Sequence, residues 1–187
     1  MSEKNPLSRF TANAATAGAQ VVETPTLEAV LDYLADKLEG GLLIPDIPAT
    51  RLFNLATALR ERGCEVIATD LRTNAASATA GLTGANFAIA ETGTLVLEST
   101  PEDIRLASTL PAKHFVLLNP DKIVADGMEA VPILRRFHQE QPRNYLAYIT
   151  GPSRTADIER VLTIGVHGPK ELHILLCEEL SDDPLCQ

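Results

Sequence analysis

The sequence has no long apolar run and no excess of basic residues. Apolar stretches such as Phe115 to Leu118 are a few residues long, whereas a helix that spans a bilayer needs about 20. The chain carries 16 Lys and Arg against 25 Asp and Glu, a net charge of -9, which disfavours binding to nucleic-acid phosphates. We expect neither a membrane nor a nucleic acid as a partner. The N-terminus has no apolar leader core and carries Glu3, so a cytoplasmic location is expected.

Cysteines are few and common cofactor motifs are missing. Cys64, Cys177 and Cys186 are odd in number, far apart and never in a C-x-x-C pair, so neither a disulfide framework nor an iron–sulfur or zinc cassette is indicated. The sequence has no Gly-x-Gly-x-x-Gly, Walker lysine loop or Gly-x-Ser-x-Gly elbow, and these are the usual signs of dinucleotide, nucleoside triphosphate and serine-hydrolase sites. We therefore predict no resident cofactor and no metal.

The length and composition favour one domain. A chain of 187 residues with 45% hydrophobic content can bury one sizeable core. We expect a single domain at residues 19–187. Residues 1–18 would precede it as an N-terminal arm, either a short helix or a loose, disordered segment.

Alternating patterns predict a mostly parallel sheet. Residues 25–38 place Val30, Leu31 and Leu34 on one helical face, and the segments that follow alternate in the βαβ rhythm. The remaining expected elements are strands at 41–45, 64–70, 113–120, 145–150 and 171–178, helices at 48–62 (Leu52 and Leu55 buried), 100–110 and 127–139, and a small-residue connection at 75–84. Residues 85–90 and 94–99 suit a hairpin that turns at Gly93. The predicted fold class is α/β, a mostly parallel sheet flanked by helices and interrupted by this antiparallel hairpin.

The first candidate site follows the strand at 145–150. The chain turns at Gly151-Pro152 and continues with Ser153, Arg154 and Thr155, where we expect a short helix whose backbone N–H groups face the carboxyl edge of the sheet. The guanidinium of Arg154 suits a carboxylate or phosphate. The alternative is that these residues only cap a helix, with Arg154 in solvent.

Two further turns carry groups suited to catalysis. In Glu91-Thr92-Gly93-Thr94 the glutamate could be a nucleophile or a general base, or the turn could be purely conformational. In the Gly165 to Pro169 turn, His167 lies between Gly165 and Gly168 and could move a proton, or it could be a turn residue without a role.

Other polar residues carry weaker signals. A metal site formed by His167, Glu171 and His173 is not expected, because alternation along the last strand could send their side chains to different faces and no fourth ligand is evident. Lys122 and Asn86 could reach an anion from neighbouring corners, but are more typical of surface or capping groups.

Three segments taken together resemble a known family. NFAIAETGTLVLES, LPAKHFVLLNPDKIV and YITGPSRTADIERVLTIGVHGPKELHILL look like the LUD domain family, of the lactate utilization protein C (YkgG) type, from about Phe10 to Glu178. The resemblance implies a fold like the NagB/RpiA/CoA transferase group. It also implies a role in converting L-lactate to pyruvate with two iron–sulfur partner proteins. The N-terminus is short for the family, so a leading helical portion is expected to be missing.

The family's motif residues coincide with the three turns. This coincidence favours one shared pocket over three separate capping coincidences. We predict Glu91 and His167 as catalytic residues, and the predicted ligand-binding residues are Thr92, Gly93, Thr94, Gly151, Pro152, Ser153, Arg154, Thr155, Gly165 and Gly168; Asp157, Glu159 and Pro169 complete the motifs. The expected function is that of a lactate-utilization component that binds a small-molecule anion, a carboxylate or a phosphate-bearing ligand. The alternative is a stand-alone CoA transferase-like or folate cyclo-ligase-like enzyme.

Overall fold

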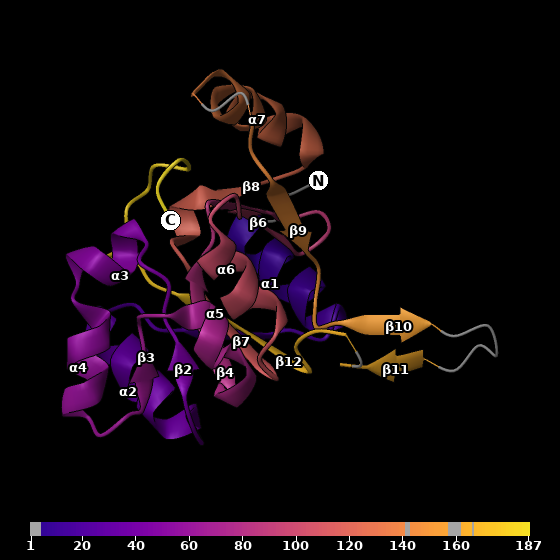
Figure 1. Ribbon diagram of the computed structural model, residues 1–187. Coiled ribbons are helices and arrows are strands. Elements are labelled where there is room, and N and C mark those ends of the chain that lie inside the picture. Colours follow the sequence, from indigo (N-terminus) through magenta and orange to yellow (C-terminus); the bar gives the residue numbers. More distant parts are fainter. Residues whose placement is uncertain (1–4, 141–142, 157–161, 166) are drawn as a thin grey trace.

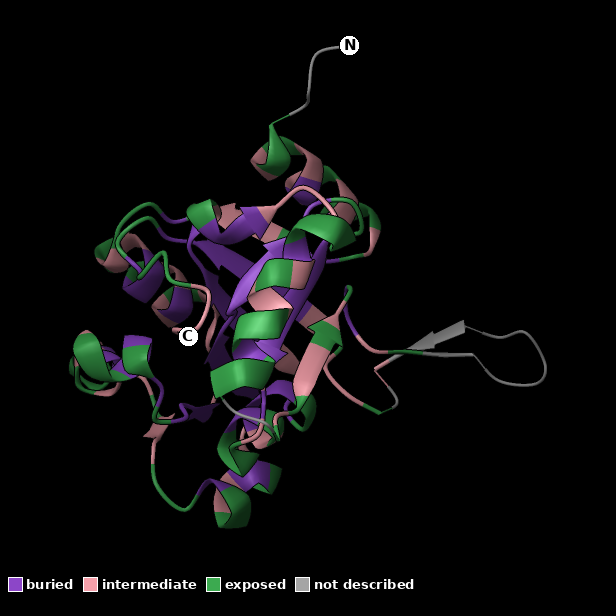
Figure 2. Ribbon diagram, turned by 90° about the horizontal axis from the view of Figure 1, so that it is seen from above, coloured by how far each residue is buried: buried purple, intermediate pink, exposed green. Residues whose placement is uncertain are grey.

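A six-stranded parallel sheet forms the centre of the molecule. The computed structural model describes residues 5–140, 143–156, 162–165 and 167–187, and Figure 1 shows their arrangement. In spatial order the strands of this sheet are β1 (Gln20–Glu23), β12 (Glu171–Leu176), β7 (Lys113–Leu118), β4 (Ala80–Gly84), β2 (Leu42–Leu43) and β3 (Val66–Ile67). Strands β12, β7 and β4 are buried along most of their length (Figure 2), as expected when both faces of a parallel sheet are covered. The predicted α/β class is confirmed.

Alternate side chains of β7 pack into two separate layers. Val116 joins an apolar cluster with Phe10 of helix α1, whereas the adjacent Phe115 joins a cluster with Leu34 of α2 and Leu59 of α4. This division follows from the two-residue period of a strand. The helices are α1 (Pro6–Thr16), α2 (Leu27–Lys37), α3 (Pro48–Leu52), α4 (Leu55–Glu61), α5 (Leu71–Asn74), α6 (Glu102–Thr109) and α7 (Gly127–Glu140), with single 3-10 turns η1 (Ala75–Ser77) and η2 (Pro120–Lys122). None of the helices in the described ranges is long and apolar enough to cross a membrane.

The predicted hairpin belongs to a second sheet. Strands β5 (Phe87–Ile89) and β6 (Thr94–Glu98) pair antiparallel, and Gly93 has φ +66° in the turn between them. The hairpin is therefore confirmed, but it does not interrupt the parallel sheet. It forms a four-stranded sheet with β8 (Ile123–Val124) and β9 (Leu146–Ile149), so the strand predicted at 145–150 also lies outside the central sheet.

The segment predicted as a small-residue connection contains the buried strand β4. Its composition, AGLTG, is poor in the β-branched and aromatic residues typical of strands. The physical reason for these small residues is the neighbouring helix α6. A Cβ on Gly81 would lie 2.0 Å from the carbonyl oxygen of Ala107, so only glycine lets α6 approach the strand this closely.

The helix predicted at 48–62 is broken into α3 and α4. Asn54 adopts φ +47° between them, a left-handed conformation that asparagine tolerates better than most residues. The break turns Leu52 outward, with 76% of its surface exposed. The prediction that Leu52 is buried was wrong, whereas Leu55 is fully buried.

The helix predicted near Thr155 is absent, and a strand takes its place. Strand β10 (Arg154–Ala156) pairs antiparallel with β11 (Leu162–Ile164), and the pair extends away from the body of the molecule (Figure 1). Ladder hydrogen bonds to β11 are long-range partners that the local capping pattern does not reveal. Asp157 and Glu159, which belong to the same motif, lie outside the described residues.

Candidate functional site

A cavity of about 250 Å³ brings two of the three predicted turns together. Its lining residues are Thr109, His114, Tyr148, Ile149, Thr150, Gly151, Pro152, Ser153, His167, Gly168, Pro169 and Leu172. His114 and Leu172 are the second residues of β7 and β12, so the cavity lies at the amino edge of the parallel sheet. The prediction that the site lies at the carboxyl edge of the sheet is wrong. The reason is that β9 belongs to the second sheet and places Gly151 at the opposite end of the central strands.

Hydrogen bonds hold the Gly151 corner against the His167 turn. The backbone N–H of Ser153 donates to the carbonyl oxygen of Pro169 at 2.9 Å, and its Oγ donates to the carbonyl oxygen of His167 at 2.9 Å. The N–H of Gly165 donates to the Ser153 carbonyl oxygen at 2.9 Å. Gly168 has φ +136°, and a Cβ there would lie 2.9 Å from the Ser153 Cβ. The contact between the two turns therefore requires glycine at 168.

Arg154 is held by helix α1 and does not line the cavity. Its guanidinium donates to the carbonyl oxygen of Ala17, just beyond the end of α1. This position lies at the negative end of the helix dipole, where a cation is favoured. Gly151 contacts the same carbonyl group: it has φ +75°, and a Cβ would lie 2.1 Å from the Ala17 oxygen. Both residues thus fix the corner to α1.

Glu91 also faces α1 and lies outside the cavity lining. Its carboxylate is 3.7 Å from Nη2 of Arg9, and 53% of the side chain is exposed. Asn13 Nδ2 donates to the carbonyl oxygens of Ala90 and Glu91 at 2.8 and 2.9 Å. A Cβ on Gly93 would lie 2.3 Å from the nitrogen of Ala14. The Glu91 turn is therefore packed against the middle and end of α1.

A chain of threonine hydroxyls connects this turn to the cavity. Thr92 Oγ1 and Thr94 Oγ1 are 2.6 Å apart, and Thr94 Oγ1 and Thr150 Oγ1 are 2.7 Å apart. Thr150 lines the cavity. Of the other predicted ligand-binding residues, Gly165 packs against Lys170, whose Cγ would lie 2.1 Å from an added Cβ, and the backbone of Thr155 lies in β10.

His114, which the sequence gave no reason to select, lies at the inner end of the cavity. Only 1% of its surface is exposed, and Nε2 lies 2.9 Å from Oγ1 of Thr83 on β4. Burial lowers the pKa of His114 to about 3, so the imidazole is neutral at pH 7. The only sequence signal was a histidine inside an otherwise apolar strand.

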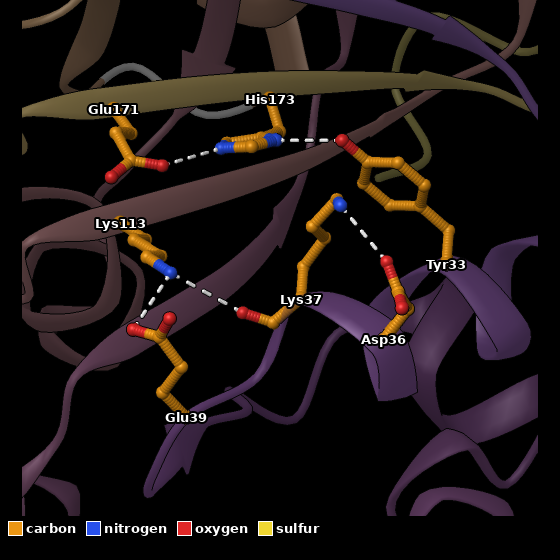
Figure 3. A network of polar contacts seen from close by, with 7 residues as sticks. All are labelled: Tyr33, Asp36, Lys37, Glu39, Lys113, Glu171 and His173. Carbon is orange, nitrogen blue, oxygen red and sulfur yellow. Dashed lines mark hydrogen bonds and ion pairs between the residues drawn. The ribbon is translucent and has the colours of Figure 1, made fainter.

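The other two residues of the rejected metal set, Glu171 and His173, lie two positions apart on the same face of β12. The expected separation of their faces was therefore wrong, and they form a polar network of their own (Figure 3). On β12, Nε2 of His173 lies 3.1 Å from Oε2 of Glu171, and Nδ1 lies 2.9 Å from the hydroxyl of Tyr33. Burial lowers the pKa of His173, and the hydrogen bond to Glu171 opposes this shift. With Nε2–H donating to the carboxylate, Nδ1 accepts from the Tyr33 hydroxyl. This network ties α2 to the sheet and contributes nothing to the cavity lining.

Known proteins resemble this chain along most of its length. It is 31% identical to lactate utilization protein C of Bacillus velezensis over 173 residues, which cover 84% of this chain and 72% of that protein. It is 27% identical to the electron transport protein YkgF of Escherichia coli over 177 residues, which cover 87% of this chain and 35% of that protein. Other relatives match over about half of this chain, and the match covers only 41% and 44% of the length of two of them.

A solved structure and a family model agree with these similarities. The crystal structure of a DUF162 family protein from Deinococcus radiodurans superposes on this chain with a TM-score of 0.69 at 23% identity. The match covers 95% of this chain and 99% of that one. At this identity the likeness concerns the fold alone. The LUD domain model matches residues 7–177, from α1 through the Glu91, Gly151 and His167 turns to the end of the last strand. The chain therefore belongs to the LUD domain family.

Proposed function

We propose that this chain is a component of L-lactate utilization, the oxidation of L-lactate to pyruvate, and that it acts with iron–sulfur partner proteins. The observation that carries the proposal is the similarity to a lactate utilization protein C along most of the chain. The name of the electron transport relative supports redox partners. In this scheme the C2–H and O–H bonds of the substrate break. The partners take up the two electrons, one proton leaves the 2-hydroxyl group, and the proton from C2 passes to solvent.

We further propose that a small carboxylate or a phosphate-bearing ligand binds in the cavity between the Gly151 corner and the His167 turn. L-lactate is the first ligand to test. The hydroxyl of Thr150 would donate to its carboxylate, since Thr150 lines the cavity and can accept from Thr94 at the same time. The Ser153 hydroxyl is already the donor to the His167 carbonyl oxygen and holds the turn in place. Of the two residues predicted to be catalytic, His167 lines the cavity and would accept the proton of the substrate's 2-hydroxyl group. The Arg154 guanidinium supports the corner through Ala17 and is not part of the proposed contact.

The alternative of a stand-alone CoA transferase-like or folate cyclo-ligase-like enzyme has less support. It requires Glu91 as a nucleophile or base in the pocket. In this fold the Glu91 carboxylate is half exposed and paired with Arg9. We therefore keep the lactate-utilization proposal alone.

Calorimetry with L-lactate tests the proposed site. The Thr150→Val and His167→Ala variants each remove one polar group of the cavity. A hydrogen bond to a charged ligand contributes about 1.5–3 kcal/mol, so each variant should bind L-lactate roughly 10- to 100-fold more weakly. His138→Ala, an exposed histidine on α7, is the matched control and should bind as the wild type does. Absence of binding heat with wild-type protein, or unchanged affinity in both variants, would overturn the site.

Co-purification tests the partnership independently. The tagged chain, isolated from cells grown on L-lactate, should carry proteins that contain iron–sulfur clusters, detected by their visible absorbance and iron content. Removal of L-lactate from the growth medium is the control. A chain that elutes alone under both conditions and oxidises L-lactate unaided would contradict the proposed division of labour.

A further inference from the structure

A nearly fully buried lysine lies at the carboxyl edge of the parallel sheet. Lys122 ends the turn η2 that follows β7, and only 4% of its surface is exposed. The ammonium donates to the carbonyl oxygen of Cys186 at 2.5 Å. In the part of the chain that the structure describes, Lys122 forms no ion pair, and this carbonyl is its one hydrogen-bond acceptor. The prediction that Lys122 is a surface or capping group is therefore wrong.

This charge is unusual because its partner is neutral. Burial lowers the pKa of Lys122, and electrostatic interactions with Cys186, Asp183 and Asp182 oppose the shift. A buried ammonium is most stable beside a full negative charge with good hydrogen-bond geometry. The position is therefore suited to an anion that comes within hydrogen-bond distance of Nζ.

Two buried asparagines, Asn119 and Asn86, also have hydrogen-bond partners among the last residues described. Asn119 Nδ2 donates to the carbonyl oxygen of Leu180 at 2.7 Å, and Asn86 Nδ2 donates to that of Pro184 at 3.0 Å. The Oδ1 of Asn86 accepts from Gln187 Nε2 at 2.7 Å. Buried polar groups need such partners. The chain at 180–187 thus satisfies polar groups at an edge where α/β sheets usually bind ligands.

A mostly apolar cavity of about 340 Å³ opens beside Lys122. Phe53, Leu117 and Leu180 contribute apolar lining, and Cys186 and Gln187 form part of the wall. The volume falls within the usual range of small-ligand sites, about 300–1,000 Å³. A Cβ on Gly84 would lie 2.9 Å from the Gln187 carbonyl carbon, so the end of β4 leaves room for a group at the position of Gln187.

We propose that this edge binds a monocarboxylate with an apolar body, and that residues 183–187 are an internal cover that the ligand displaces. One carboxylate oxygen would accept from Lys122 Nζ in place of the Cys186 carbonyl oxygen. The body of the ligand would pack against Phe53 and Leu117. Arg51 also lines the cavity, but its guanidinium is paired with Asp46 through two hydrogen bonds. The remaining cation, the Lys122 ammonium, matches one negative charge better than the two of a phosphate group. The site is distinct from the proposed lactate cavity, because the two linings share no residue.

Calorimetry with sodium hexanoate tests the proposal. Gln187→Ala removes the hydrogen bonds of Nε2 to Asn86 Oδ1 and to the Glu98 carbonyl oxygen, 2.7 and 2.8 Å long. Loosening the cover in this way should tighten hexanoate binding about tenfold. Adding Lys122→Met to that variant should weaken binding at least about tenfold, whereas adding Lys170→Met, an exposed lysine, should leave it unchanged. No hexanoate binding by Gln187→Ala, or full binding after Lys122→Met, would overturn the proposal.

Hydrogen exchange provides a second readout that does not need the lysine variant to fold. The N–H of Ala49 on α3 donates to the Gln187 carbonyl oxygen at 3.0 Å, a hydrogen bond between the body of the protein and the cover. Hexanoate should accelerate exchange of this amide in Gln187→Ala because the cover leaves the edge. Slower or unchanged exchange at saturating hexanoate would contradict displacement. Hexanoate binding should be insensitive to His167→Ala, and L-lactate binding insensitive to Lys122→Met, so either site can fail without the other.

Discussion

His114 should make this protein lose stability as the pH falls from 7 to 5. The imidazole is buried between β4 and β7, with Thr83 Oγ1 as its hydrogen-bond partner. Burial lowers its pKa from 6.5 to about 3. The perturbation that isolates this residue is His114→Gln, which keeps a polar group able to bond Thr83 and removes the titration.

The sign and size follow from proton linkage. The unfolded chain binds a proton at His114 near pH 6.5, whereas the folded chain does so only near pH 3. The free energy of unfolding therefore keeps its full value, as far as His114 is concerned, above about pH 6.5. It decreases as the pH falls from there toward 3. These two pKa values correspond to a loss of about 2 kcal/mol between pH 7 and pH 5, and about 4 kcal/mol by pH 3. The lowered pKa of His173 also decreases the free energy of unfolding as the pH falls. This effect is present in the wild type and in His114→Gln alike, so it cancels in their comparison.

Urea unfolding followed by circular dichroism gives the required measurement. The free energy of unfolding of wild-type protein and His114→Gln is compared at pH 7 and pH 5. The variant should lose about 2 kcal/mol less over this interval, whatever its stability at pH 7. His138→Gln, at an exposed site on α7, is the control and should keep the wild-type dependence. Equal losses in wild type and His114→Gln would refute the reasoning, because they would mean that His114 titrates normally in the folded state.

Two packing predictions concern the elements that position the candidate site. Gly81→Ala should destabilise the protein by about 1–3 kcal/mol or prevent folding, because the new Cβ would meet the Ala107 backbone. The control is Gly127→Ala, because nothing lies within 4 Å of a Cβ at that position. Equal melting temperatures for the two variants would contradict the packing argument. Phe10→Ala should lower the free energy of unfolding by about 3–5 kcal/mol in urea titrations, because Phe10 is fully buried. Leu52 is exposed on α3, so Leu52→Ala should change the free energy of unfolding by less than about 0.5 kcal/mol. A loss of similar size in the two variants would refute the burial argument.

Much of the fold could be predicted from local periodicity. Val30, Leu31 and Leu34 lie on one face of α2 and are buried, as their three- and four-residue spacing predicted. The apolar runs at 113–118 and 171–176 are central strands, and Gly93 turns the hairpin. These elements follow from interactions between residues close in the sequence, which a pattern can record.

The missed elements depend on distant partners. The sequence of strand β4 is typical of a linker because the strand needs a glycine at position 81. The backbone of Ala107 on α6 lies too close to Gly81 to allow a side chain there. Strand β10 looks like a capped helix start because its hydrogen bonds go to β11. Helix α1, left open by the sequence, is an ordered helix whose Phe10 packs in the core.

For the candidate site, the order of residues along the chain shows which turns carry reactive groups, whereas folding selects which of these turns meet. Ser153 and His167 lie together because backbone hydrogen bonds join their turns. Arg154 and Glu91 are instead engaged by α1, through Ala17 and Arg9. The burial of Lys122 was equally invisible in the sequence, because it depends on residues about 60 positions away that cover the sheet edge. Periodicity reports on neighbours along the chain, whereas the direction and partner of a polar side chain are set by whatever the fold brings beside it.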